Sequence, residues 1–124
     1  MAASPQSFPK SEHLRRPADF RRVYDRHCSL RADLLTLYAC PNDLDHARIG
    51  FSVSRKVGGA VYRNRLRRLY REAYRLVREQ LPRGLDLVII PRGAALPDLQ
   101  YLKDTLVTLA GDLARKLSQG KKPS

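Results

Sequence analysis

Arginine side chains dominate the segment from Ser52 to Arg78, and their chemistry suits the binding of a polyanion. A guanidinium group carries a permanent charge and a rigid set of N–H donors, so it can bridge phosphate oxygens or stack on a base. Two short motifs concentrate this chemistry, residues 54–58 (Ser-Arg-Lys-Val-Gly) and residues 63–65 (Arg-Asn-Arg). We therefore expect phosphate binding, and structured RNA is the polyanion that this chemistry favours.

The spacing of these arginines predicts that they share one face of a helix. At about 100° per residue, a row of arginines four residues apart runs from Arg63 to Arg75, and the apolar residues of the same segment group on the opposite side. Like charges at this spacing repel by about a few tenths of a kcal/mol per pair in an isolated helix. We interpret Glu72 and Glu79, on the exposed side, as relieving this repulsion, and we expect an external partner to neutralise the other charges.

Catalysis by the chain itself is not expected. An enzyme that acts alone needs a nucleophile with a base, a carboxylate pair or a metal cluster, and the sequence shows none of these patterns. Cys28 and Cys40 lack the C-x-x-C spacing and the accompanying histidine pair of a zinc site. We therefore predict no catalytic residue and no metal site in the protein chain.

Composition indicates one basic domain. Lys and Arg total 24 against 12 Asp and Glu, for a net charge of +12 over 124 residues. Residues 1–11 and 118–124 are predicted to be flexible tails, and residues 12–117 to form the domain. The sequence shows no disulfide framework, no secretory signal and no long apolar run, so we expect a cytoplasmic protein that does not enter a membrane.

Hydrophobic periodicity predicts an α+β fold. A first helix is expected over residues 18–27, the long basic helix over 61–80 and a last helix over 98–117. Strands are expected over residues 33–40, 48–54 and 85–90, with room for one more short strand before the basic helix. We expect the strands at 33–40 and 48–54 to pair as a hairpin.

Two features allow more than one interpretation. Gly58 and Gly59 precede the basic helix, where they could form a flexible loop or let backbone N–H groups approach a phosphate. The aromatic residues Phe20, Tyr24 and Tyr38 could pack in the core or stack on unpaired bases.

The motifs together resemble the signature of the bacterial ribonuclease P protein component. The match covers residues 50–58 (Gly-Phe-Ser-Val-Ser-Arg-Lys-Val-Gly), 60–61 (Ala-Val), 63–69 (Arg-Asn-Arg-Leu-Arg-Arg-Leu) and 71–73 (Arg-Glu-Ala). It extends more loosely to residues 19–24, 35–38 and 84–88, so that the resemblance spans about residues 12–115. Gly59 departs from the family, which often carries Lys or Asn there.

The resemblance implies a subunit of a ribonucleoprotein that removes the 5′ leader of precursor tRNA. In that family a catalytic RNA performs the phosphodiester hydrolysis with Mg²⁺, and the protein alone is inactive. The implied partners are this catalytic RNA and precursor tRNA, with no membrane and no DNA. The positions that match the family's binding residues for the catalytic RNA are Arg55, Lys56, Arg63, Asn64, Arg65, Arg67, Arg68 and Arg71.

The resemblance also implies a leader-binding cleft between the first helix and the sheet. The matching positions are Phe20, Tyr24, Tyr38 and Ser52. The implied fold is a ribosomal S5 domain 2-like α+β domain, with a mostly antiparallel sheet packed by helices. It contains a left-handed strand–helix–strand crossover, an exception to the usual right-handed rule.

Two other functions compete with this interpretation. A structural RNA-binding protein, such as a ribosomal component, would use the same charge but would need no leader cleft. A DNA-binding module would present varied side chains to base edges, whereas this basic helix offers almost only Arg, which contacts phosphate.

Overall fold

A four-stranded mixed sheet forms the centre of the structure, which is a computed structural model. Its strands are β1 (Ser29–Arg31), β2 (Leu35–Pro41), β3 (Arg48–Phe51) and β4 (Leu85–Pro91). The order across the sheet is β1-β2-β4-β3, in which β2 pairs antiparallel with β1 and β4, and β3 pairs parallel with β4. The optional strand expected before the basic helix is therefore the short β1, and β4 is a central strand.

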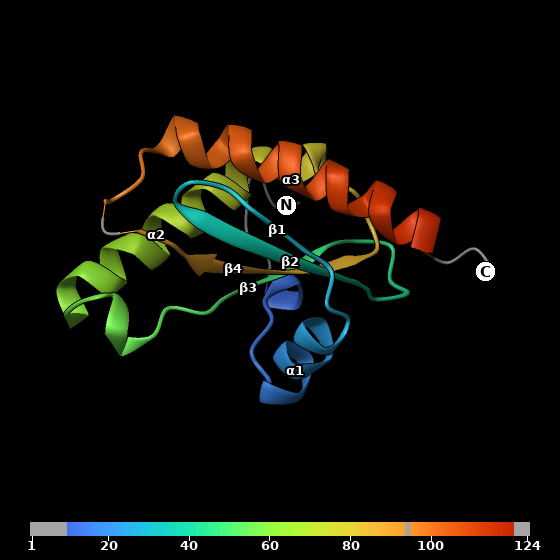
Figure 1. Cartoon of the computed structure of the whole chain (residues 1–124), viewed down its shortest axis with the longest axis horizontal. Helices are drawn as coiled ribbons and strands as arrows, with labels where there is room; N and C mark the ends of the chain where they lie inside the picture. The colour runs from blue at the N-terminus through green and yellow to red at the C-terminus, as the bar shows by residue number, and fades with distance from the viewer. Residues whose placement is uncertain (1–9, 94, 121–124) are drawn as a thin grey trace, which may run out of the picture.

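Helices cover both faces of this sheet. The structure describes residues 10–93 and 95–120. Within them, α2 (Ala60–Val77) and α3 (Leu99–Gly120) lie over one face, and α1 (Pro17–Asp25) lies under the other (Figure 1). Short 3₁₀ turns precede α1, precede α2 and follow α2; they are η1 (Lys10–Glu12), η2 (Arg55–Val57) and η3 (Arg78–Gln80).

The alternation of side chains along β4 produces two hydrophobic clusters. Leu87 and Ile89 are fully buried in the main core between the sheet, α2 and α3. Val88 points the other way and packs with Val23 of α1 in a smaller cluster. This confirms the strand expected over residues 85–90, and the apolar side chains on both of its faces explain how α1 is held against the sheet.

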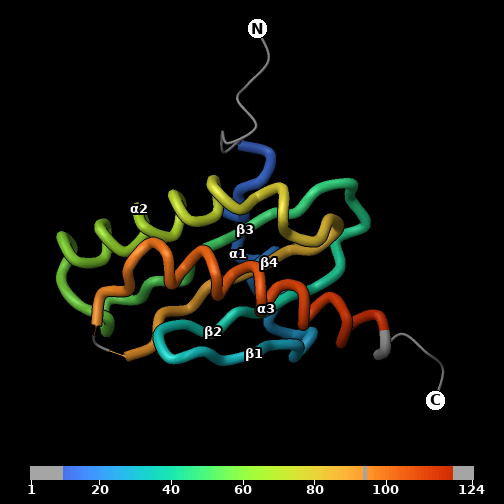
Figure 2. The backbone as a smooth tube through the Cα atoms, turned by 90° about the horizontal axis from the view of Figure 1, so that it is seen from above, coloured from blue at the N-terminus to red at the C-terminus, as the bar shows by residue number. Residues whose placement is uncertain are grey.

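The unit β3–α2–β4 joins two adjacent parallel strands. In Figure 2, which views the sheet from the helix side, β3 and β4 both run from right to left and β4 lies below β3, so β4 is on the left of β3 when one looks along the strand direction. The crossover is therefore left-handed, as the resemblance implied and against the usual preference of such units.

One predicted pairing is wrong. The strand that begins at Arg48 does not form a hairpin with β2, because β4 lies between them and pairs with both. Alternating apolar residues reveal that a segment is a strand, but its hydrogen-bonding partner depends on how the whole sheet is assembled.

The helix boundaries shift slightly from the expected ones. The basic helix ends at Val77 and continues only as η3, and α3 extends to Gly120. The α3 N-terminus follows the prediction, because the Oδ1 atom of Asp98 accepts a hydrogen bond of 2.7 Å from the backbone N–H of Tyr101. The tails predicted at residues 1–11 and 118–124 lie for the most part outside the described residues, and their flexibility stays a prediction.

Candidate nucleic-acid interface

The η2 turn and the exposed side of α2 bring most of the predicted RNA-binding residues onto one surface. Gly58 and Gly59 separate this turn from α2, so the turn lies at the N-terminal end of the helix (Figure 1). We call this the arginine surface. Its exposed side chains are Arg55, Lys56, Asn64, Arg65, Arg68 and Arg71.

Arg63 and Arg67 are turned partly inward and bind backbone. Arg63 donates from Nε to the carbonyl of Gly58 at 3.1 Å, and Arg67 donates from Nη2 to the carbonyl of Val53 at 3.2 Å. Arg67 also donates to the side chain of Asn64 at 3.2 Å. These bonds hold the loop that carries η2 against α2, a structural role that the sequence did not reveal.

The C-terminal end of the arginine row is neutralised within the protein. Arg75 makes two hydrogen bonds to Glu72, at 3.1 and 2.6 Å, and Arg78 donates from Nε to Glu12 at 2.8 Å. The interpretation of Glu72 as a residue that offsets arginine charge is therefore confirmed at Arg75.

Glu12 is a buried carboxylate, and η1 brings it beside the end of α2. Burial by itself raises the pKa of Glu12, but hydrogen bonds from Arg78 and from the Tyr74 hydroxyl, the latter at 2.7 Å, outweigh it and lower the pKa. Nothing in the local sequence around Arg78 indicated this partner, which lies 66 residues earlier.

The start of α2 leaves backbone donors available. Gly59 is the N-cap residue, no side chain of the described residues caps the helix, and a Cβ atom at Gly59 would meet nothing within 4 Å. The first N–H groups of a helix lack intrahelical acceptors and attract anions. The geometry is thus compatible with a phosphate that approaches the backbone N–H groups after Gly58 and Gly59. A residue with a side chain would also fit at position 59.

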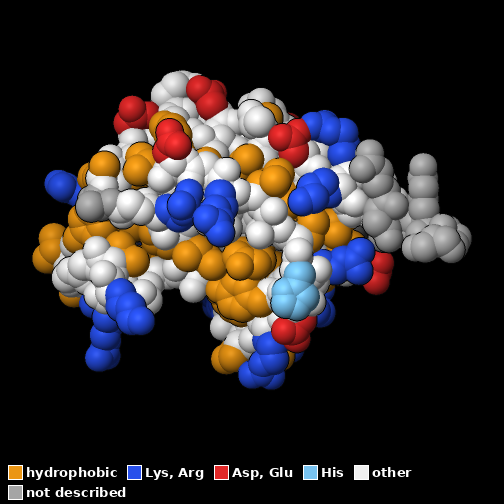
Figure 3. All heavy atoms as spheres, in the orientation of Figure 1, with side chains coloured by type: hydrophobic (Ala, Val, Ile, Leu, Met, Phe, Trp, Pro, Cys, Tyr) orange, Lys and Arg blue, Asp and Glu red, His pale blue; other side chains and the backbone are white. Residues whose placement is uncertain are grey.

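The aromatic residues of α1 and β2 form a half-buried cluster under the sheet. The ring of Tyr24 meets Tyr38 edge-on with centroids 5.2 Å apart, and Phe20 lies 6.4 Å from Tyr24. All three rings pack on the smaller core, yet none is fully buried. Figure 3 shows the resulting hydrophobic surface between the sheet and α1. The rings therefore contribute to the core and also offer exposed ring surface.

Ser52 lies beside this cluster rather than within it. Its side chain lines a shallow hollow together with Phe20, Tyr24 and the cationic side chains of Arg15 and Arg21. Tyr38 does not line this hollow and reaches it only through Tyr24. The structure thus brings three of the four predicted leader-binding residues together and places the fourth behind them.

Gly50 provides the space in which Phe20 sits. A Cβ atom at Gly50 would come within 2.5 Å of the ζ carbon of the Phe20 ring. The position of that ring therefore depends on a residue without a side chain in β3.

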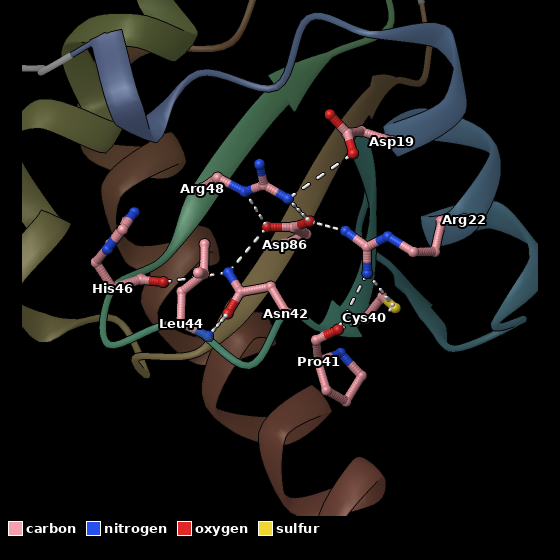
Figure 4. Close-up of polar contacts among 9 residues, drawn as sticks. All are labelled: Asp19, Arg22, Cys40, Pro41, Asn42, Leu44, His46, Arg48 and Asp86. Carbon is pink, nitrogen blue, oxygen red and sulfur yellow. Dashed lines mark hydrogen bonds and ion pairs between the residues drawn. The ribbon is translucent and has the colours of Figure 1, made fainter.

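A buried carboxylate attaches α1 to the sheet (Figure 4). Asp86 of β4 accepts hydrogen bonds from Arg48 at 2.8 and 2.6 Å, from Asn42 at 2.9 Å, and from Arg22 of α1. Burial by itself raises the pKa of Asp86, but the bonds and charges of Arg48, Asn42 and Arg22 outweigh it and lower the pKa. The sequence contained one signal of this site, a lone acid in an otherwise apolar strand.

The described residues contain no metal-binding cluster. Within residues 10–93 and 95–120, no group of three His, Cys, Asp or Glu side chains is arranged to hold a metal ion. Over the same residues, the helices are too short or too polar to cross a membrane.

Comparison with known proteins shows which sequences this chain is similar to. The family model described as Ribonuclease P matches residues 8–114. The ribonuclease P protein component of Clostridium botulinum (strain Langeland) is 41% identical over 102 residues, covering 81% of this chain and 92% of the relative. That of Roseiflexus castenholzii is 39% identical over 115 residues, covering 89% and 94%.

Solved structures give the same result. The ribonuclease P protein from Thermotoga maritima superposes with a TM-score of 0.73 at 31% identity, covering 82% of this chain and 96% of that protein. The Staphylococcus aureus protein gives a TM-score of 0.71 at 30% identity, covering 86% and 97%. The similarity therefore includes both the sequence and the whole fold.

Proposed function

Because the chain belongs to the ribonuclease P protein family, and is thus a subunit of the tRNA-processing endoribonuclease, we propose that its two surfaces bind two different RNAs. The arginine surface binds the RNA subunit of the enzyme. The aromatic cluster of α1 and β2 binds the 5′ leader of precursor tRNA. A purely structural RNA-binding role, such as that of a ribosomal component, is not favoured by the similarity.

The exposed arginine surface is the observation that supports RNA binding. Arg65, Arg68 and Arg71 point away from the core and form no ion pair within the described part of the chain. Their mutual repulsion is relieved when phosphate groups bind them, and counterions leave the RNA at the same time. If about five phosphates are neutralised, log K falls against log salt with a slope of roughly −4.

The aromatic cluster supports the leader-binding part of the proposal. Phe20 and Tyr24 expose ring surface beside Arg15 and Arg21, and although Asp25 also lines this hollow, the lining pairs stacking surfaces with a positive charge on balance. A single-stranded leader presents unstacked bases and phosphates to such a site. Mature tRNA has no leader, so these contacts favour the precursor over the product.

Mg²⁺-dependent hydrolysis belongs, in this proposal, to the RNA subunit and not to the protein. The metal ions are held mainly by the RNA subunit and the substrate, and no residue of this chain is assigned to catalysis. The protein contributes by reducing the repulsion between two polyanions, so that they associate at lower Mg²⁺ concentration. This role places the protein in the cytoplasm with its RNA.

Cleavage of a precursor tRNA at low Mg²⁺ tests the proposal. Bacterial ribonuclease P RNA is assayed with and without the protein, and the protein is assayed alone. We expect removal of the 5′ leader only when RNA and protein are combined. If the protein binds the RNA tightly but does not restore leader cleavage at low Mg²⁺, the subunit role is contradicted. Cleavage by the protein alone would contradict the assignment of catalysis to RNA.

A further inference from the structure

An apolar hollow opens beside the arginine surface, between α2 and the segment that leads into α3. It has a volume of about 360 Å³ and is lined by Arg65, Arg68, Leu69, Glu72 and Leu96. Leu96 is 37% exposed, and Leu44 and Val61 are the other large hydrophobic side chains exposed in the described ranges. Leu69 packs against the main core, whereas Leu96 belongs to neither hydrophobic cluster, so packing of the core does not account for the Leu96 side of the hollow.

The hollow divides the arginines of α2 into two groups with different surroundings. Arg63 and Arg67 turn toward the loop before the helix and bind its carbonyl groups. Arg65 and Arg68 project from a different part of the helix circumference and line the hollow. The guanidinium groups of Arg65 and Arg68 are therefore available to a ligand, whereas those of Arg63 and Arg67 hold the loop.

The charge at the rim is positive on balance. Glu72 is the one acidic residue of the lining, and both of its carboxylate oxygens accept hydrogen bonds from Arg75. Its charge is offset, and it does not cancel the guanidinium groups of Arg65 and Arg68. The occupant should thus combine an apolar surface with negative charge on each side of it.

We propose that this hollow receives one unstacked nucleobase of the RNA subunit. The base lies against Leu69 and Leu96, and the phosphates on its two sides are bound by Arg65 and Arg68. This inference rests on the proposed binding of the RNA subunit by the arginine surface. A volume near the lower end of the range for small-ligand sites, about 300–1,000 Å³, leaves room for a single nucleotide and not for a folded segment.

General features of RNA recognition favour this occupant. Proteins recognise RNA largely through bases that are splayed out of the helix, and the flat faces of such bases are apolar while their phosphates stay charged. A hydrophobic peptide would satisfy Leu69 and Leu96 but would leave the two rim arginines without an anionic partner. Charge complementarity therefore selects a nucleotide.

The test separates the apolar contact from the ionic ones. Binding of the full-length protein to ribonuclease P RNA is measured over a range of salt concentrations for Leu96→Ala and for the control Leu44→Ala. Leu44 is 42% exposed and precedes β3, away from the hollow. We expect Leu96→Ala to weaken binding about fivefold or more at every salt concentration with an unchanged salt slope. Leu44→Ala should bind like the wild type.

Two further variants identify what the hollow recognises. Arg65→Ala should weaken binding and also reduce the salt slope by about one, because it removes a phosphate contact. Leu96→Met restores apolar volume and should restore most of the affinity. The proposal would be overturned if Leu96→Met binds the RNA as weakly as Leu96→Ala, or if Leu96→Ala binds it like the wild type.

Chemical probing of the RNA locates the base directly. We expect one base to be protected from a base-modifying reagent by the wild-type protein and by Leu44→Ala, but to react again in the complex with Leu96→Ala. The absence of such a base would reject the inference while leaving RNA binding intact. Failure of the wild-type protein to bind the RNA at all would instead reject the proposed function.

Discussion

Arg22 of α1 donates a hydrogen bond to the carboxylate of Asp86, which is completely buried in the central strand β4 (Figure 4). The two residues are 64 positions apart, and the contact joins the helix that carries Phe20 and Tyr24 to the middle of the sheet. Arg22 also reaches the Pro41 carbonyl at 3.1 Å at the end of β2. The orientation of the proposed leader-binding surface thus depends on one buried charge.

Replacing Asp86 by Ala should lower the free energy of unfolding by about 2 kcal/mol or more, because Arg48 and Arg22 lose a shared buried acceptor. Urea denaturation measures the change. Asp112→Ala is the matched control, since it removes an exposed ion pair with Arg115 and should cost less than about 1 kcal/mol. Equal effects of the two substitutions would contradict the anchoring role of Asp86.

Asp86 should also make stability depend on acid pH. Its pKa is lowered in the folded state by Arg48, Asn42 and Arg22 despite burial, so in acid the unfolded state binds a proton more readily than the folded state. The stabilisation is therefore complete above the unfolded pKa of about 4 and is lost as pH falls through the lower folded pKa.

Urea denaturation at a series of pH values measures this dependence. The Asp86→Asn variant lacks the titrating group and should lose less stability than the wild type on acidification below about pH 4. The pKa of Glu12 is also lowered in the folded state. Glu12 is present in both the wild type and the variant, so its effect on the pH profile is common to the two. If the free energy of unfolding of the two proteins changes with pH in parallel, Asp86 is not the source of the pH dependence.

Neutralised and free arginines should differ in their contribution to RNA binding. Arg71→Ala removes an exposed charge and is expected to reduce the salt slope of RNA binding by about one. Arg75→Ala removes a charge already bound to Glu72 and should change the slope less. The measurement is the dissociation constant for ribonuclease P RNA against salt concentration, and equal slope changes would contradict the distinction.

The position of the Phe20 ring should affect substrate preference. Phe20→Ala removes a stacking surface and is expected to reduce the preference of the holoenzyme for precursor over mature tRNA by about fivefold or more. Gly50→Ala should have a similar effect, because its added Cβ atom would displace the same ring.

Dissociation constants of precursor and mature tRNA for the reconstituted holoenzyme measure this preference. Affinity of the protein for the RNA subunit serves as the control and should not change, since Phe20 belongs to α1, which lies on the opposite face of the sheet from α2. Loss of RNA-subunit binding, or an unchanged preference, would count against a leader-binding role for this ring.

The sequence by itself determined the kinds of elements and the character of the surfaces. Periodicity placed the helices and strands within a few residues, and the spacing of the arginines indicated a cationic helix face suited to phosphate. Such patterns are local, because side-chain direction repeats about every 3.6 residues in a helix and every 2 in a strand. The lone acid in β4 was visible too, although its partners were not.

Tertiary structure decided which groups meet. The pairing of β3 with β4 rather than β2, the neutralisation of Arg78 by Glu12, and the hollow between Leu69 and Leu96 all join residues far apart in the chain. These contacts depend on the order of strands in the sheet and on how η1, α2 and the segment before α3 pack together. The sequence showed that the surface is cationic, and only the fold showed which of its charges are paired within the described residues and which are exposed.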